Sequence, residues 1–165
     1  MTKVVLLERL RDFTVETVRD IIMPVRPGDA RGKGDAPLFR PADVYLMRLE
    51  KSSAAEKATP YILHQAITGK DTQQEGARAS GFAVVRSIFA VYNEDEQKGG
   101  LMLLNLMERL RIALLEQVVI GKQFQLDLTA GLETLVYPDD TAPYYAGEMM
   151  STWRIPRVTR IAKEV

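Results

Sequence analysis

Apolar residues recur at helical spacing at the start of the chain, from residue 2 to residue 23. Charged side chains, such as Arg9, Arg11, Glu16 and Arg19, lie elsewhere around the axis, and Pro24 ends the pattern because proline cannot continue a helix. Thr14 and Val15 form helices poorly, so a break near Phe13 stays open. The apolar positions are Leu6, Leu7, Leu10, Val15, Val18 and Ile22.

A second apolar stripe at helical spacing predicts a helix over residues 101–119, and we expect its apolar side chains to lie in the core. Asn93 and Asp95 lie upstream as N-terminal caps, and Gly121 is a suitable C-terminal stop. The stripe consists of Leu103, Leu106, Met107, Leu110 and Leu114.

Six runs rich in β-branched and aromatic residues predict strands, because such side chains suit a pleated, half-buried surface. Residues 82–92 form the strongest run, which is nearly apolar on both faces, so we expect it in the centre of its sheet. The other five runs cover residues 44–50, 60–69, 124–128, 132–137 and 147–155.

The order of predicted elements is helix, three strands, helix, three strands. Consecutive strands joined by polar loops favour antiparallel pairing. The sequence therefore predicts a single α+β domain over residues 1–165, with a mainly antiparallel sheet and both helices on one face. The other face is expected to be partly open or covered by a partner.

Residues 24–41 are too rich in proline and glycine for a regular element and predict a flexible loop. A loop of this length is usually functional or disordered. A plain surface loop is one interpretation, and contact between its cations and a polyanion is the other. If the loop carries little core, replacing the cations by alanine leaves the fold intact. These cations are Arg26, Arg31, Lys33 and Arg40. At the other end, the polar residues 156–165 predict an exposed C-terminal arm.

Composition narrows the classes of function. Lysine plus arginine number 22, as do aspartate plus glutamate, so the formal net charge is zero. This balance argues against a protein that coats nucleic acid or acidic membranes, because such binding uses many uncompensated cations. The absence of cysteine excludes disulfides and thiolate chemistry. The apolar runs are too short for a signal peptide or a membrane span, so we expect a soluble protein.

His64 is the only histidine, and we expect an ordinary strand histidine with a hydrogen bond. A zinc site needs further nitrogen or sulfur ligands, and the sequence has no nucleophile elbow to complete a Ser-His-Asp triad. The run GDARGKGD differs from a phosphate-binding loop in glycine spacing, in the residue after Lys33 and in the preceding element. We therefore expect no catalytic residue, metal or cofactor.

The run YPDD, with Asp139 and Asp140, has the composition of a turn, because proline presets φ and aspartate bonds to its own backbone. In the strand that follows, alternation places Glu148 and Arg154 on one face and Trp153 on the other. One face is apolar enough to bury. Whether the aromatic and methionine side chains serve the core or a subunit interface stays open, because both environments use them.

Several segments resemble small structural proteins encoded in the tail modules of bacteriophages and prophages of Gram-positive bacteria. The most telling are a strand ending in Tyr-Asn-x-Asp, a helix containing Leu-Met-Glu-Arg-Leu-Arg, and the strand Gly-Glu-Met-Met-Ser-Thr-Trp. The similarity covers about residues 44–158. The element order also resembles that of the tail terminator proteins of long-tailed phages, which is an analogy of fold.

The resemblance implies a non-enzymatic protein whose copies form a ring, typically a hexamer, that caps the tail tube and joins it to the head. The implied partners are further copies of the chain, the tail tube protein and a head-completion protein. DNA passing through the lumen would touch the ring transiently, and no membrane is involved. The implied location is the host cytoplasm during assembly and then the virion tail or neck.

Two groups of residues are candidates for contacts in such a ring. The lumen-facing group comprises Arg26, Arg31, Lys33 and Arg40. The group for a subunit or tail-tube interface comprises Tyr144, Tyr145, Met150, Trp153 and Arg154. Two other functions stay open: a head-completion or other minor tail protein of the same module, and a monomeric phage-encoded binding module. An enzyme has the least support, because candidate acids, bases and nucleophiles do not converge.

Overall fold

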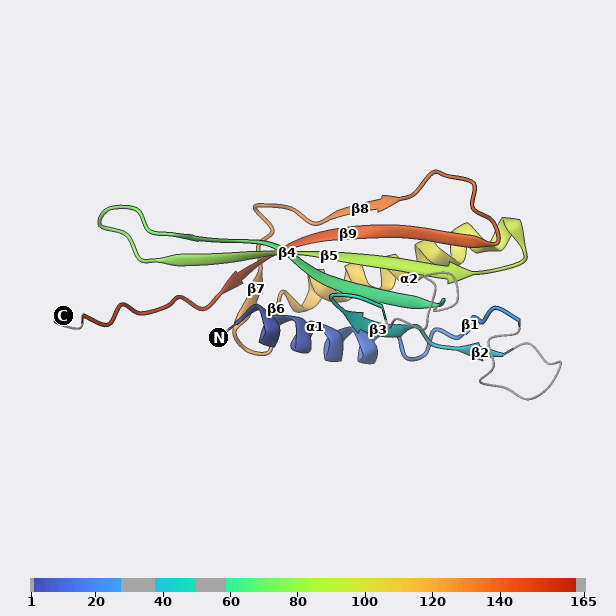
Figure 1. Ribbon diagram of the computed structural model, residues 1–165, viewed down its shortest axis with the longest axis horizontal. Coiled ribbons are helices and arrows are strands. Elements are labelled where there is room, and N and C mark those ends of the chain that lie inside the picture. Colours follow the sequence, from blue (N-terminus) through green and yellow to red (C-terminus); the bar gives the residue numbers. More distant parts are fainter. Residues whose placement is uncertain (1, 28–37, 50–58, 163–165) are drawn as a thin grey trace.

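The computed structural model describes residues 2–27, 38–49 and 59–162, and in these ranges two helices cover one face of a seven-stranded sheet (Figure 1). The predicted α+β fold with a mainly antiparallel sheet is confirmed. Neither helix combines the length and apolar character that crossing a membrane requires.

Side-chain caps set the starts of both helices. Helix α1 (Lys3–Val18) begins after Thr2, whose hydroxyl accepts a hydrogen bond from the Val5 N–H at 3.4 Å. It runs through Phe13 without a break. Helix α2 (Glu96–Gln117) begins earlier than its apolar stripe predicts, because the Asp95 carboxylate accepts from two backbone N–H groups of the first turn.

Three long antiparallel strands form the centre of the sheet. Strand β5 (Ser80–Tyr92) lies between β4 (Tyr61–Thr72) and β9 (Tyr144–Ile155), so its predicted central place is confirmed. The outer strands are β3 (Asp43–Leu46) beside β4, β7 (Phe124–Leu126) and β8 (Glu133–Val136) beside β9, and β6 (Val119–Ile120) beside β7.

Strand β3 pairs with β4 in parallel, with Asp43 opposite Tyr61 and Leu46 opposite His64. The expectation that consecutive strands pair antiparallel is therefore wrong at this edge. A parallel pair needs a connection of about a dozen residues or more to return the chain to the same end, and residues 47–60 provide it.

The segment 24–41 is not irregular throughout, which corrects the prediction of one loop. Its ends form a two-stranded antiparallel ladder between β1 (Met23–Pro24) and β2 (Phe39–Arg40). The Val25 N–H extends the ladder by donating to the Leu38 carbonyl at 2.9 Å. The two ends are thereby tied to each other, and residues 28–37 lie outside the described residues.

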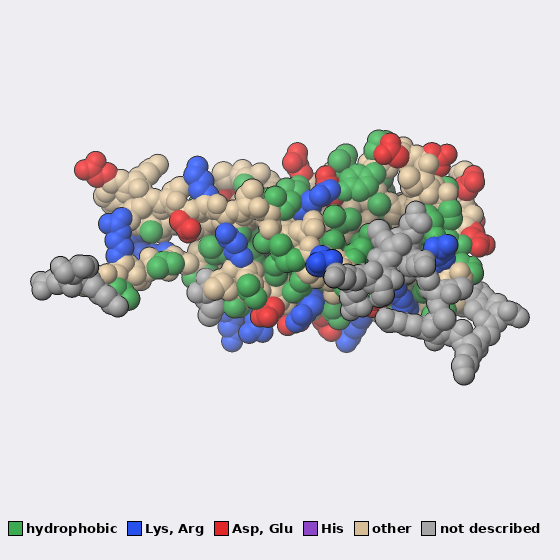
Figure 2. Space-filling model, viewed as in Figure 1, with side chains coloured by type: hydrophobic (Ala, Val, Ile, Leu, Met, Phe, Trp, Pro, Cys, Tyr) green, Lys and Arg blue, Asp and Glu red, His purple; other side chains and the backbone are tan. Residues whose placement is uncertain are grey.

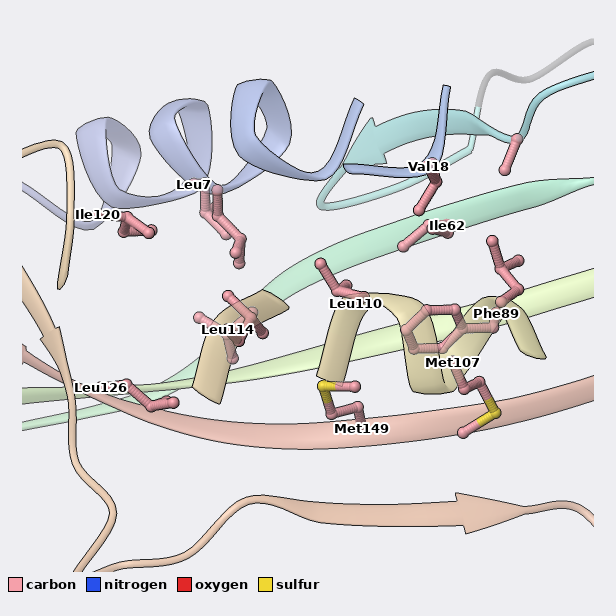
Figure 3. Close-up of a cluster of buried hydrophobic side chains, with 14 of the residues drawn as sticks. Leu7, Val18, Ile62, Phe89, Met107, Leu110, Leu114, Ile120, Leu126 and Met149 are labelled. Carbon is pink, nitrogen blue, oxygen red and sulfur yellow. The ribbon is translucent and has the colours of Figure 1, made fainter. Parts of the chain in front are cut away.

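One hydrophobic core joins the apolar stripes of both helices to the inner side of the sheet (Figure 3). Each large aliphatic or aromatic side chain buried there contributes roughly 1.5–3 kcal/mol. The largest fully buried side chains are Trp153, Phe89, Phe124, Leu6, Leu10, Met23, Ile62, Leu103, Leu106, Met107, Leu110 and Leu114. The stripe predicted for the second helix is thus confirmed as core.

Strands β4 and β5 continue as a hairpin past the helices (Figure 1). A register shift between Ala66 and Thr68 leaves Ile67 as the extra residue of a bulge. Residues 156–162 leave β9 at the same end of the sheet, and the side chain of Lys3, at the start of α1, lies beside Gly69 in the hairpin. The hairpin and both ends of the described chain therefore share one end of the molecule.

Candidate functional site

Trp153 does not lie on the surface, so the expectation that it forms part of an interface is wrong. Its side chain is 0% exposed, and its indole N–H donates to the Ser151 hydroxyl at 2.9 Å. The alternation predicted along β9 is correct, but the face that carries Trp153 is the one under the helices. Its role is in the core.

The two predicted interface tyrosines are half-buried and make contacts within the chain. The Tyr144 ring lies 5.5 Å from the Tyr92 ring, measured between centroids, in a tilted arrangement. The Tyr145 ring lies against Gly99 of α2, where a Cβ atom would overlap it. Glycine at position 99 is therefore required for this close approach of strand and helix.

Met150 and Arg154 lie on the face of β9 that the helices do not cover. Arg154 is the most exposed of the five predicted interface residues. Its Nε is 3.8 Å from an Asp127 carboxylate oxygen. Its guanidinium carbon is 6.0 Å from the centre of the Phe82 ring. Met150 is half-buried between Arg86 and Glu133 on the adjacent strands. These two remain candidates for contact with a partner.

A polar cluster on the same face was not predicted. Arg86 donates to the Glu148 carboxylate and, at 3.0 Å, to the Tyr137 hydroxyl, which itself donates to Glu148 at 3.2 Å. The hydrogen bonds to Glu148 and Tyr137 raise the pKa of Arg86. The cluster ties the end of the β8 segment to β5 across β9. Pairing partners of this kind follow from strand register, which the sequence pattern does not supply.

Arg40 was predicted to face a lumen, and the structure corrects this. Its guanidinium donates to the carbonyls of Thr59 at 3.2 Å and Pro60 at 3.0 Å, and pairs with the Asp43 carboxylate at 2.9 Å. The Arg40 side chain is 19% exposed. It joins the start of β3 to the segment before β4. Of the other three cations, Arg26 is half-buried, and Arg31 and Lys33 lie outside the described residues.

Replacing Arg40 by alanine is expected to lower the free energy of unfolding by about 2 kcal/mol, because charge-assisted hydrogen bonds to partly buried carbonyls are lost. Arg40→Lys is the matched control: it keeps the charge but lacks the planar fork, so it should recover only part of the loss. Urea unfolding of the three proteins measures both effects. An unchanged Arg40→Ala midpoint would contradict the structural role.

His64 is buried in the core and makes hydrogen bonds through both ring nitrogens, so the expectation of an ordinary strand histidine is confirmed. Its Nδ1 lies 2.7 Å from the Ser87 hydroxyl and its Nε2 2.9 Å from the Thr14 hydroxyl, which donates to the Leu10 carbonyl at 2.7 Å. The Thr14 oxygen therefore accepts from Nε2–H, and Ser87 donates to Nδ1. Burial lowers the pKa of His64 to about 3. With Ser87 buried as well, a substrate cannot reach this pair.

The end of the molecule that carries the hairpin holds a groove of about 330 Å³ between the hairpin and the C-terminal arm. Arg78, Arg157 and Arg160 line it. We call this the basic groove.

At the opposite end, residues 93–96 and 137–143 lie next to each other, joined by a hydrogen bond from the Asn93 N–H to the Pro143 carbonyl at 2.9 Å. We call these two segments the acidic end, and Figure 2 shows the acidic side chains gathered there.

Strand β8 forms an exposed edge of the sheet. All four of its residues are exposed, including Leu135 at 52% and Val136 at 43%, and its only strand partner in the described part of the chain is β9. Such an edge presents unpaired backbone N–H and C=O groups together with apolar side chains, so it is suited to pairing with another strand.

Within the described ranges, no group of three or more histidine, aspartate and glutamate side chains is placed to hold a metal ion. The turn predicted at Asp139 and Asp140 is present: the Asp140 carboxylate accepts from the Ala142 N–H at 3.4 Å, and the Tyr144 N–H donates to the Thr141 carbonyl at 3.0 Å. The features that stand out are therefore surfaces: the basic groove, the acidic end and the β8 edge.

A comparison with protein-family models finds none that matches this chain, and a comparison with curated proteins finds no significant match.

Proposed function

We propose that the protein is a structural assembly protein of a phage or prophage tail module, whose copies form a ring that caps the tail tube and joins it to the head. The observation that carries this proposal is the hairpin that projects past the helices (Figure 1). Residues 67–71 and 73–78 of this hairpin are exposed. Because an isolated hairpin is at best marginally stable in water, an extension of this kind is suited to pack against a neighbour.

The two edges of the sheet support the same function. On one side, β8 exposes its outer edge, and on the other, β3 covers only the first four residues of β4, Tyr61 to His64. The two edges differ in sequence and length, so a contact that joins one edge to the other would be head-to-tail. Such contacts give a closed ring when the rotation between neighbours divides a full turn evenly.

The buried histidine is consistent with a role in assembly. Ser87 and His64 form the one contact in the described residues that resembles part of a catalytic triad, and both are closed off by α1 and the sheet. Solvent-exposed charged side chains lie on the outer faces of both helices and at the two ends of the sheet, where a neighbouring molecule can touch them.

Light scattering after gel filtration, over a range of concentrations, tests this proposal together with electron microscopy of tail tubes. We expect rings, typically hexamers, either alone or on mixing with the tail tube protein of the same module, and tubes with one capped end. Rings that bind only the head side would instead assign a head-completion role. A protein that stays monomeric alone and with tubes would overturn the proposal and favour a monomeric binding module.

A further inference from the structure

Three arginines in the basic groove have no acidic partner among the residues that the structure describes. Arg78 comes from the hairpin, and Arg157 and Arg160 come from the C-terminal arm. All three side chains are exposed, and none makes an ion pair with another described residue. The hairpin also carries Asp71 and Glu75, but neither lines the groove. The groove therefore presents a cluster of unpaired positive charge between two segments of backbone.

The acidic end carries the opposite charge. Glu94, Asp95 and Glu96 lie at the start of α2, and Asp139 and Asp140 lie in the turn before β9. All five are exposed, and Lys98, which is 3.8 Å from Asp95, is the lysine nearest to them in the sequence. The turn joins the end of β8 to the start of β9 at this end of the sheet (Figure 1). Its exposed carboxylates carry the charge that a basic groove attracts.

The two surfaces lie at opposite ends of the sheet, which prevents their contact within one chain. Strands β5 and β9 span the distance between them: Gly81 pairs with Ile155 at the groove end, and Tyr92 pairs with Tyr144 at the acidic end. Eleven residues at about 3.3 Å each place the two ends roughly 36 Å apart. Their charges can meet only between molecules.

We infer that the basic groove receives the acidic turn, with Asp139 and Asp140, of a second copy of this chain. This inference rests on the proposed function, and it adds to the sheet edges a second pair of surfaces, at the two ends of the sheet, that joins neighbours in the ring. The contact is head-to-tail, because each copy contributes a different surface to each of its two neighbours. Opposite charge at the two surfaces attracts the correct ends, and like charge keeps two grooves or two acidic ends apart.

A nucleic acid is the other polyanion that three arginines could bind, but the observations favour a second copy. The chain as a whole has no net positive charge, and the groove is short, so few phosphates would be neutralised. The acidic turn of the same chain supplies a matching anion at equal concentration.

Charge reversal at each surface tests the inference. Arg157→Glu with Arg160→Glu gives a groove variant, and Asp139→Lys with Asp140→Lys gives a turn variant. Each variant alone should associate at least about tenfold more weakly than wild type, because like charges then face each other. An equimolar mixture of the two should regain wild-type association, because every contact in an alternating assembly is again between opposite charges. Sedimentation velocity at 0.15 M and 1 M NaCl measures each sample.

Circular dichroism and the melting temperature confirm that both variants fold, which we expect because all four side chains are exposed. Arg19→Glu with Arg48→Glu is the matched control for the groove variant: it makes the same change in net charge at exposed positions outside both surfaces. It should associate like wild type. Equal weakening in this control would show that net charge alone controls association, and would overturn the inference.

The remaining outcomes separate this inference from the proposed function. If wild type assembles and both reversal variants assemble equally well, the groove and turn are the wrong surfaces, but the ring stands. If wild type stays monomeric at every concentration and with tail tubes, both proposals fall. If the groove variant loses binding to labelled duplex DNA while its self-association is unchanged, the groove is a nucleic-acid site and the inference is overturned.

Discussion

Trp153→Ala is expected to lower the free energy of unfolding by about 4 kcal/mol, which is a large part of the stability of a domain of this size. Trp153 is fully buried, and its neighbours in the core come from both helices and the central strands. Removing the indole leaves a cavity that rigid strands and helices cannot close, and the Ser151 hydroxyl loses the N–H that bonds to it. Urea unfolding followed by circular dichroism measures the loss.

Arg154→Ala is the matched control for this change, because Arg154 is adjacent on the same strand but lies on the other face. Its loss should be less than about 1 kcal/mol, since its ion pair with Asp127 is long and half-exposed. Trp153 is also the only tryptophan, so its fluorescence reports on one site. We expect the emission of an apolar environment in the native protein. A Trp153→Ala variant with unchanged stability and lost self-association would restore the interface role.

The second large effect is a loss of stability in acid that comes from His64. In the folded protein, burial holds the pKa of His64 near 3, whereas the unfolded chain has the ordinary value of 6.5. Below pH 6.5 the unfolded state binds a proton that the folded state does not, so stability falls as the pH falls toward 3. At pH 5 this single group costs roughly 2 kcal/mol relative to pH 7.5.

Urea unfolding of wild type and His64→Gln at both pH values isolates this contribution, because the carboxylates are the same in the two proteins and cancel. The variant should lack the part of the pH dependence that His64 causes. If the variant does not fold, the nitrogen NMR signals of the single histidine in wild type give an independent result. They should show a neutral ring with the proton on Nε2 and no titration between pH 5 and 8. A ring that titrates near pH 6.5 would contradict the sealed network.

The periodicity of the sequence predicts much of this fold. Both helices, the central place of β5 and the alternation along β9 follow from local patterns, because a helical stripe and a two-residue repeat are properties of short segments. The pattern also identifies the inner stripe of α2. It does not decide whether Trp153 lies under a helix or against another subunit, because both environments select large apolar side chains.

Features that depend on long-range pairing were not predictable. The parallel pairing of β3 with β4 requires a connection that returns to the starting end, and composition does not give the path of residues 47–60. The bulge at Ile67 is a second case: before it, Ile62 and His64 face the helices, and after it Gly69, opposite Ala83, does. One extra residue exchanges the two faces of the strand, so a strict two-residue repeat fails across it.

The site was predicted only in part for the same reason. The sequence alone identifies Arg40 only as a cation in a loop. Its structural role depends on the carbonyls of Thr59 and Pro60, which lie beside it only in the folded chain. The basic groove combines a turn near residue 78 with an arm near residue 160, and only the pairing of β5 with β9 brings these segments together.

The start of α1 and the end of β9 both lie at the hairpin end of the molecule, and this has a practical consequence for the use of the recombinant protein. An affinity tag at the carboxyl terminus would follow closely on Arg157 and Arg160 in the sequence, and an acidic epitope tag there could occupy the groove itself. Tags therefore need to be cleaved before the oligomeric state is measured. The amino terminus lies beside the hairpin, because the Lys3 side chain contacts Gly69. A small fluorophore attached there should change its emission when a neighbouring copy binds to the hairpin end.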